Sequence, residues 1–460
     1  MLQSISDFIW TYILLAVLVG CGLYFSVRTR FVQFRFIGEM FRLLGEGAVS
    51  GTKGKHINSF QAFAVSVATR VGTGNLAGVA TAIVLGGPGA VFWMWLIALI
   101  GSATAFVEST LAQLFKRKST DSFIGGPAFY ILHGLHSKWM SRLFAVMLII
   151  TFGLSYNSIQ SNTICNAMDE AFGFDPMVVG IVLTALSLLV VFGGIQRVAK
   201  VSSVVVPVMA IGYFLLAFFV VVANIRLLPD VFRLIFSDAF GVHQVAGGGI
   251  GATMLYGIKR GLFSNEAGEG SAPNVAATAA VSHPVKQGLI QALGVFTDTL
   301  LVCSCTAFII LVSGLYSSPE LNGIRLTQQA LHSEIGDVGT YFIAAAILLF
   351  AFSSIIGNYY YGEANIRFLT GKRSVLTLYR LLSGGAMVMF GALATLEIVW
   401  DLGDVCMALL TACNLVAIVL LGRYAFRLLD DYIRQKREGK NPTFNISTLP
   451  EIKDDVECWG

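Results

Sequence analysis

Residues 70–80 read Arg-Val-Gly-Thr-Gly-Asn-Leu-Ala-Gly-Val-Ala, and their glycines interrupt an otherwise apolar segment. Residues 260–268, Arg-Gly-Leu-Phe-Ser-Asn-Glu-Ala-Gly, repeat the Arg, Asn, Ala and Gly at an offset of 190. The same offset pairs Glu108 with Asp298, each of which follows a Phe two residues earlier. Because the register holds across two consecutive apolar segments, we interpret the match as an internal repeat.

The composition around this repeat is that of a membrane protein. Apolar residues make up 55% of the chain and charged residues only 13%, whereas a soluble domain has about 25% charged residues. Glycine, with 48 residues against 10 prolines, lets transmembrane helices approach closely. The first apolar segment, 5–27, has an acidic flank and no small-residue cleavage site, so we expect a retained helix rather than a signal peptide.

Eleven segments are long and apolar enough to suggest membrane spans, since a helix needs about 20 residues to cross a bilayer. Segment 246–282 is too long and too rich in glycine for one straight helix. Four shorter amphipathic stretches lie between spans, at 31–47, 125–135, 229–238 and 324–335. The predicted spans are 5–27, 57–86, 89–115, 140–168, 177–194, 203–224, 246–282, 286–314, 340–366, 375–395 and 402–423.

The basic residues predict how these spans are oriented. With the N-terminus outside, 25 of the 31 Lys and Arg residues fall on the inner side, three fall outside and three lie within spans. Because inner loops carry the excess of Lys and Arg, we expect the N-terminus outside and the C-terminus in the cytoplasm. The tail is polar and charged, and we expect a short cytoplasmic helix followed by a disordered end.

The repeat divides the chain into four parts. Five spans separate the first motif from its partner, and this odd number places the two halves in opposite orientations. We therefore expect an all-α integral membrane protein in which one leading helix precedes an inverted five-plus-five repeat with two broken helices. The parts are a leading helix with a cytoplasmic amphipathic segment (1–56), the first repeat (57–224), the second repeat (225–423) and the cytoplasmic tail (424–460).

The glycine clusters predict where the two helices break. Val71–Asn75 and Gly261–Asn265 interrupt apolar helices, and unwound backbone is tolerated in a membrane where protein or a wet cavity satisfies it. A break exposes N–H groups that suit a carboxylate and carbonyl groups that suit a cation. A zwitterionic amino acid needs both kinds of backbone group, because it carries a carboxylate and an ammonium group. The alternative interpretation is that these glycines only permit close helix packing.

Four longer motifs resemble the alanine-or-glycine:cation symporter family, the sodium:alanine symporters. The resemblance covers nearly the whole chain and implies the leucine-transporter fold, in which broken helices form the substrate site. It also implies sodium-driven uptake of a small amino acid across a bacterial inner membrane. The motifs are RVGTGNLAGVA (70–80), GGPAFY (125–130), GLFSNEAGEGSAP (261–273) and FAFSSIIGNYYYGE (350–363).

The resemblance implies roles for particular residues at the two breaks. Gly72, Thr73, Gly74 and Asn75 resemble the turn that binds the substrate carboxylate. Gln160 resembles a polar contact to the substrate, although an interhelical hydrogen bond is the alternative. The opposing segment, which would meet the ammonium group and the side chain, comprises Phe263, Ser264 and Asn265.

A sodium site is implied further along the chain. Ser353 and Ser354 are adjacent hydroxyls in an apolar run, and they resemble the sodium-site pair of the wider fold. Backbone carbonyls of Ala68 and Val71 would complete the site, because hard cations prefer oxygen ligands. The alternative is that the serines only hydrogen-bond the preceding helical turn. Sodium is thus expected as the coupling ion, and no cofactor is expected.

Asn358 departs from the family pattern, since many relatives carry Trp at this position. It lies four residues after Ser354 and so on nearly the same helix face. A smaller polar side chain there would enlarge the pocket. We therefore expect alanine or glycine as substrate, with a larger polar amino acid such as glutamine or serine as the alternative.

Charged residues within predicted spans are candidate gates, because an ionised group in hydrocarbon is costly and is usually functional. We expect them to pair across the repeat and to break and reform during transport, with a static ion pair or exposure to a vestibule as the alternative. The candidates are Arg70, Arg260, Glu266, Glu269, Glu108 and Asp298.

Other classes of protein fit the sequence less well. Proton-coupled amino-acid transport would use Glu266 or Glu269 as the proton carrier. A membrane enzyme would need a nucleophile–base pair or a metal cluster near one interface, and the sequence offers neither. A passive channel would not need two broken helices at mid-depth. The expected partners are therefore an amino acid, sodium and the lipid bilayer, and we expect no nucleic-acid binding.

Overall fold

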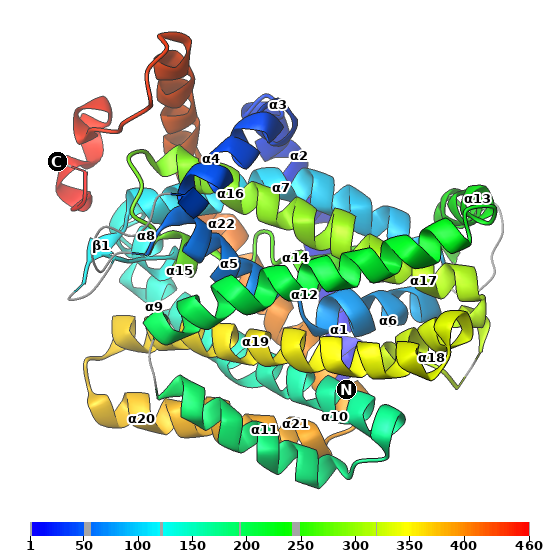
Figure 1. The fold of residues 1–460 in the computed structure, drawn as a ribbon. Coiled ribbons are helices and arrows are strands. Elements are labelled where there is room, and N and C mark those ends of the chain that lie inside the picture. The colour runs from blue at the N-terminus through cyan, green and yellow to red at the C-terminus, as the bar shows by residue number, and fades with distance from the viewer. Residues whose placement is uncertain are drawn as a thin grey trace.

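The structure is a computed structural model of the 460-residue chain. It describes residues 2–49, 57–119, 123–192, 195–241, 249–318 and 320–459. Helices dominate these ranges, and most run roughly parallel in a single bundle (Figure 1). The described strands are β1 (Arg117–Lys118) and β2 (Phe123–Ile124), which pair antiparallel in one small hairpin.

Each of the eleven apolar segments is helical in its described part, as the hydropathy pattern predicts. Several are interrupted by π-helical turns, and two are broken. The helices are α1 (Leu2–Ile9), α2 (Leu15–Arg28), α5 (Ser59–Arg70), α6 (Val79–Gly86), α7 (Ala90–Leu114), α9 (Lys138–Leu148), α10 (Asn157–Phe172), α11 (Pro176–Val191), α12 (Ile195–Ala223), α14 (Gly249–Asn265), α15 (Pro273–Ala276), α16 (Pro284–Val295), α17 (Ser304–Ser313), α19 (Asp337–Leu369), α20 (Arg373–Leu381), α21 (Met387–Leu393) and α22 (Leu396–Arg437).

Seven helical stretches in the described ranges are individually long and apolar enough to cross a membrane. An eighth results if Ala210–Ala223 and Leu228–Ala239, which meet at 102°, count as one bent span. The helix Pro176–Val191 and the segment Gly74–Gly86 are apolar but shorter. The chain is therefore a multi-pass membrane protein, while the count of eleven spans remains a prediction.

The amphipathic stretches also form helices, which lie between the spans. Their apolar faces pack against the bundle, as a one-sided apolar pattern requires. They are α3 (Val32–Arg35), α4 (Ile37–Val49), α8 (Pro127–Gly134), α13 (Leu228–Ala239) and α18 (Gly323–Ile335). In Figure 1, α13 and α18 lie at one end of the bundle, and α8 and β1 lie at the other.

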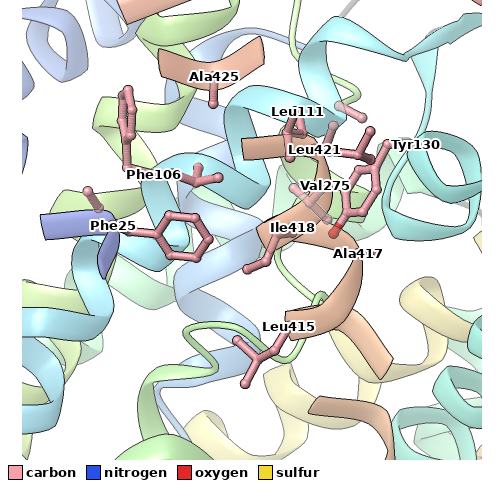
Figure 2. Packing of buried hydrophobic residues seen from close by; sticks show 14 of the residues in the cluster. Phe25, Phe106, Leu111, Tyr130, Val275, Leu415, Ala417, Ile418, Leu421 and Ala425 are labelled. Carbon is pink, nitrogen blue, oxygen red and sulfur yellow. The ribbon is translucent and has the colours of Figure 1, made fainter. Parts of the chain in front are cut away.

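The centre of the bundle is a continuous apolar core around α22. Its side chains come from α2, α7, α8, α15 and α22, whose sequences are far apart (Figure 2). Large apolar side chains on the outer helices are exposed instead, among them Leu189 at 68% and Phe218 at 56%. Such an apolar exterior suits contact with lipid. The labelled core residues are Phe25, Phe106, Leu111, Tyr130, Val275, Leu415, Ala417, Ile418, Leu421 and Ala425.

The C-terminal tail differs from the sequence prediction. Helix α22 continues without a break through Tyr424 and ends at Arg437. The residues that follow fold back and form two short 3-10 helices, Ile446–Thr448 and Pro450–Asp455. The predicted disordered end is therefore wrong, because apolar side chains between the charges are buried in this segment, namely Ile446, Leu449, Ile452 and Trp459.

Candidate functional site

The first break follows α5, whose start is fixed by a capping box between Asn58 and Gln61. The helix ends at Arg70, and Val71 is extended with φ −76° and ψ 96°. Helical geometry resumes in the π-helical turn Gly74–Gly78. The predicted interruption of this helix is therefore confirmed.

The glycine at this break permits a very close approach. A Cβ atom on Gly72 would overlap the Ser354 hydroxyl oxygen and would lie 3.0 Å from Gln160 Oε1. The Gly72 N–H donates to Asn75 Oδ1 at 2.9 Å, so the turn is held by its own asparagine. The residue after α5 thus meets side chains of α10 and α19. This close contact is possible because Gly72 has no side chain.

The second break lies further along its helix than the sequence predicts. Helix α14 includes the predicted interruption Gly261–Asn265 and ends there, and the chain bends over the following residues. Glu266, Gly268 and Gly270 have positive φ values of 56°, 95° and 81°. The prediction for this helix is corrected, because the left-handed residues that stop an L-amino-acid helix come after Asn265. The Asn265 side chain accepts the Ala267 N–H at 3.0 Å.

Gln160 on α10 reaches the first break directly. The backbone N–H and the hydroxyl of Thr73 donate to Gln160 Oε1, at 3.1 and 2.7 Å. The interhelical hydrogen bond that the sequence offered as an alternative is therefore present. The same contact brings Gln160 beside Gly72, where the helix is unwound.

Oxygen atoms converge where α19 crosses α5. The hydroxyls of Ser354 and Ser353 lie 3.0 and 3.4 Å from the Ala68 carbonyl oxygen. Both hydroxyls also lie within 3.0 Å of the Phe350 carbonyl, as serines in helices commonly do. Val71 follows on the same helix at the start of the break. Such a set of neutral oxygens suits a hard cation such as sodium.

Asp298 joins the two broken helices. Its Oδ1 accepts from Asn75 Nδ2 at 2.7 Å, and its Oδ2 accepts from the Ser264 hydroxyl at 2.7 Å. Thr299 adds a third donor at 3.0 Å, and its hydroxyl oxygen accepts from Asn265 Nδ2 at 3.3 Å. The Asp298 carboxylate is fully buried. Neutral hydrogen-bond donors stabilise its negative charge, and the arginine that the sequence suggested does not pair with it.

Aromatic rings close one side of the site. Phe263 lies with its ring centroid 4.8 Å from that of Tyr156 and 4.8 Å from that of Trp400. Sequence reasoning missed Tyr156 and Trp400, because a single aromatic residue in an apolar segment looks the same as a core residue or an interface anchor. Gly74 packs against the same helix, since a Cβ there would lie 3.0 Å from the Phe263 ring.

Asn358 is a buried amide without a protein partner. It is 1% exposed, and neither its nitrogen nor its oxygen has a hydrogen bond within the described ranges. Ser354 and Tyr361 on the same helix contact α5, and Asn365 contacts the segment that begins α15. At 100° per residue, Asn358 lies on the face that these three residues share. Asn358 therefore lies on the face of α19 that packs against α5 and α15.

The intramembrane arginines do not pair with the acids that the sequence suggested. Arg260 makes a bidentate ion pair with Asp404, at 2.8 and 3.1 Å, and Lys259 lies 2.7 Å from the same carboxylate. Arg70 donates to the Gln291 carbonyl at 3.3 Å, and its other guanidinium nitrogens are buried without a partner among the described atoms. Asp404 lies 144 residues beyond Arg260, and no local pattern connects them.

The three glutamates are held by neutral groups at the second break. Glu108 accepts from the Gly268 N–H at 3.2 Å and from an asparagine of α22 at 2.8 Å. Glu266 accepts from the Ser271 hydroxyl at 2.5 Å, and the Tyr156 hydroxyl lies 3.4 Å from Glu269. The expected pairing among these charges is thus not found in the described ranges. A gating role for them remains a prediction.

The whole site is closed to solvent. All nine residues assigned to the substrate and all four assigned to sodium are buried.

Known proteins resemble this chain over most of its length. The profile of the sodium:alanine symporter family matches residues 1–446. The probable sodium/glutamine symporter GlnT of Bacillus subtilis is 51% identical, with 99% of this chain and 94% of that protein covered. The amino-acid carrier protein AlsT of the same organism is also 51% identical (99% and 96% covered). The sodium/alanine symporter AgcS of Methanococcus maripaludis is 34% identical (92% and 94% covered).

Solved structures resemble the fold. MhsT in complex with L-phenylalanine superposes with a TM-score of 0.56 at 12% identity, with 88% of this chain and 93% of that chain covered. A mutant of the manganese transporter of Eremococcus coleocola gives a TM-score of 0.51 at 14% identity (84% and 81% covered). At such identities the likeness establishes the architecture alone, which is the expected leucine-transporter-like arrangement of helices.

Proposed function

The chain belongs to the sodium:alanine symporter family, and from this membership we propose that it carries a neutral amino acid together with sodium. Its relatives and structural neighbours are transporters, so it is a membrane transporter and not an enzyme. The direction of coupling, the ion and the substrate are parts of the proposal.

One observation carries the proposal of sodium coupling. The Ser354 hydroxyl lies 3.0 Å from the Ala68 carbonyl and against the backbone of Gly72. A sodium ion held by Ala68, Val71, Ser353 and Ser354 would therefore adjoin the unwound turn. The substrate carboxylate would replace Asn75 Oδ1 and Gln160 Oε1 as the acceptor for the Gly72 and Thr73 N–H groups of that turn. Because ion and carboxylate would be neighbours with opposite charges, each would stabilise binding of the other.

We propose that transport proceeds by alternating access between two inverted repeats, 57–224 and 225–423. The closed site lies where the broken helices of the two repeats meet, as expected for such carriers. The distribution of basic residues supports an orientation with the N-terminus outside and the C-terminus in the cytoplasm. Residues 1–56 and 424–460 lie outside the repeat.

Asn358 favours a substrate with a polar side chain. A buried amide that lacks both its donor and its acceptor bond costs roughly 1–3 kcal/mol for each unsatisfied group. The carboxamide of glutamine can donate to the Asn358 oxygen and accept from its nitrogen at the same time. A relative described as a probable glutamine symporter is 51% identical, against 43% and 34% for two relatives described as alanine carriers. We therefore place glutamine above the alanine or glycine that the sequence alone suggested.

Proton coupling is the second candidate, and Glu269 is the observation that favours it. This carboxyl group is fully buried, and its hydrogen bonds in the described ranges are two contacts of 3.4 Å from one tyrosine hydroxyl. Because these long hydrogen bonds stabilise the ionised carboxylate only weakly, Glu269 is suited to bind a proton. The serine oxygens at Ala68 still favour sodium, since hydroxyls coordinate a cation and do not titrate usefully.

Uptake by proteoliposomes tests both candidates. We expect labelled glutamine to accumulate under an inward sodium gradient, and accumulation to stop when choline replaces sodium at fixed pH. Accumulation driven by a pH gradient in choline would instead support proton coupling. Competition by unlabelled alanine, glycine, serine and glutamine then ranks the substrates. If none of these amino acids is accumulated under either gradient, the proposal is wrong.

A further inference from the structure

The C-terminal tail packs as an ordered strap across one end of the bundle. We use the term C-terminal strap for residues 441–459, which leave α22 and return toward α7 and α15 at the left of Figure 1. The Ile446 N–H donates to the Trp459 carbonyl at 2.9 Å, so the end of the strap is tied to its beginning. Trp459 is only 7% exposed and its ring lies against that of Phe444, with centroids 5.5 Å apart.

The tip of the strap is bound to the end of α7. The indole N–H of Trp459 donates to the Gln113 carbonyl at 2.9 Å. The Lys116 ammonium lies over the Trp459 ring, 4.6 Å from its centroid, and 4.1 Å from the centroid of Phe123. Burial lowers the pKa of Lys116 to about 7, and aromatic faces favour the charged form. Arg117 adds a hydrogen bond of 2.8 Å to the Asp455 carbonyl.

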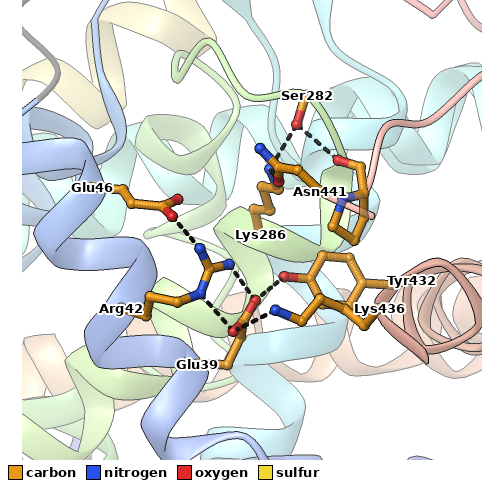
Figure 3. Close-up of polar contacts among 9 residues, drawn as sticks. Glu39, Arg42, Glu46, Ser282, Lys286, Tyr432, Lys436 and Asn441 are labelled. Carbon is orange, nitrogen blue, oxygen red and sulfur yellow. Dashed lines mark hydrogen bonds and ion pairs between the residues drawn. The ribbon is translucent and has the colours of Figure 1, made fainter. Parts of the chain in front are cut away.

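The base of the strap is bound to the connection between α15 and α16. The Phe444 N–H donates to the Ser282 carbonyl at 2.8 Å. The Ser282 hydroxyl donates to the Pro442 carbonyl at 2.9 Å, and Lys286 donates to Asn441 Oδ1 at 2.6 Å (Figure 3). Two hydrogen bonds therefore hold this part of the strap to the connection, and a third holds it to the first turn of α16.

The end of α22, from which the strap departs, is itself clamped. Tyr432 and Lys436 donate to the Glu39 carboxylate of α4, which also pairs with Arg42 (Figure 3). The Arg42 guanidinium holds the pKa of Glu39 down at about 2 against the opposing effect of burial. Glu39 is thus ionised at any ordinary pH. The strap therefore departs from a helix end that is held by an ion-pair cluster.

The connection that the strap binds also meets a residue that precedes the first broken helix. Ile57, just before α5, forms a parallel bridge with Ala279, and its carbonyl accepts from the Ala280 N–H at 3.0 Å. Gln113 Nε2 donates to the carbonyls of Ala276 and Ala279, at 2.5 and 2.9 Å. Lys116 also donates to the Ala279 carbonyl, at 3.1 Å.

Gln113 and Lys116 therefore serve two contacts at once. Their side chains tie the end of α7 to the carbonyls of Ala276 and Ala279, and the Gln113 backbone and the Lys116 ammonium hold the tip of the strap. This junction between α7 and the α15–α16 connection must separate before a ligand can leave the buried site toward the face on which the strap lies. Separation would move the α15–α16 connection away from α7, and the strap is hydrogen-bonded to both.

We propose that the C-terminal strap is a latch that holds this face of the transporter closed, and that its tip must detach from α7 before the face opens. In the orientation proposed above, this is the cytoplasmic face, and the latch controls release of the substrate into the cell. The latch itself rests on the packing alone and not on the identity of the substrate or the ion.

Amide hydrogen exchange of the full-length protein, without substrate, tests the latch. Trp459→Ala removes the indole hydrogen bond and both ring contacts. We expect exchange in residues 274–283 and 57–60 to rise roughly tenfold, because opening of a local unit is set by the contacts that close it. Trp459→Phe keeps a ring but loses the N–H, so its effect should be smaller. Lys453→Ala, an exposed position in the same strap, should leave exchange unchanged.

Two outcomes would overturn the proposal. If the strap itself exchanges rapidly in Trp459→Ala while residues 274–283 stay protected, the strap covers the junction without holding it. If exchange rises equally at α13 and α18, at the other end of the bundle, Trp459 stabilises the whole fold and no latch exists. A transport measurement supplies an independent check, since a weakened latch should speed efflux of preloaded glutamine several-fold in Trp459→Ala and not in Lys453→Ala.

Discussion

The two broken helices share a sequence motif, but their breaks lie on opposite sides of its asparagine. In the first, the helix ends at Arg70 and the break precedes Asn75. In the second, the helix runs through the matching Asn265, and the break follows it. The same asparagine therefore begins one half-helix and ends the other.

The breaks also differ in construction. The first has one extended residue, Val71, and a glycine pressed against Ser354 and Gln160. The second spans several residues, three of which have positive φ, and it carries Glu266 and Glu269. The first break is short and the second is longer and left-handed, and from this difference we predict that the first contacts the substrate directly and the second does not. We expect substitutions at the first break to abolish binding and those at the second to affect stability and rates.

The largest effect is expected at Gly72. In Gly72→Val the new side chain would overlap Ser354 and crowd Gln160, and overpacking at such a site costs several kcal/mol, which weakens substrate binding at least roughly 100-fold. Equilibrium binding of labelled glutamine to purified protein measures the loss. Gly78→Ala is the control, because its Cβ would lie 3.6 Å from the nearest atom, in Trp400. Normal binding by Gly72→Val would place the substrate elsewhere.

The next effect is expected at the serine pair. Ser353→Ala and Ser354→Ala combined remove two oxygens beside the Ala68 carbonyl. Loss of contacts to a charged ligand should raise the sodium concentration for half-maximal uptake at least roughly tenfold. Ser313→Ala removes an equivalent back-bonded serine, which lies 2.8 Å from the Ile310 carbonyl, and should behave as wild type. Unchanged sodium dependence in the double variant would refute the sodium assignment.

A selective effect is expected at Asn358. Asn358→Leu keeps the size of the side chain but removes the amide, and glutamine uptake should weaken roughly ten- to hundredfold. Uptake of alanine, which cannot use the amide, should change much less. Asn358→Trp should keep or improve alanine and glycine uptake while excluding glutamine. Competition assays give the rank order, with Tyr360→Trp as a control for bulk on nearly the opposite face of the same helix. An unchanged order in both variants would place Asn358 outside the pocket.

The smallest effect is expected at Gly268 in the second break. Gly268→Ala forces a side chain into a left-handed conformation with φ 95°, which costs about 1–2 kcal/mol. We expect a thermal unfolding temperature lower by a few degrees in detergent, with glutamine affinity largely retained. Loss of binding comparable to that of Gly72→Val would show that the second break binds as directly as the first.

The amino-acid sequence by itself determined the helical membrane architecture and the first break, and it predicts the repeat. The length of an apolar run and the spacing of glycines are local properties. They indicate whether a segment can span a bilayer and where its helix can break. Motif resemblance then placed Ser353, Ser354, Gln160 and Asn358 in one site. The contacts of Gly72 with Ser354 and Gln160 agree with that grouping.

The tertiary structure alone decided how distant segments meet. Asp404 neutralises Arg260 across 144 positions, Tyr156 and Trp400 enclose Phe263, and the strap binds α7 through Trp459. Composition made the tail look disordered, because its apolar residues are few and separated by charges. An isolated apolar side chain in the tail is ordered only when another part of the chain supplies the surface that buries it. The local sequence does not indicate where that surface lies.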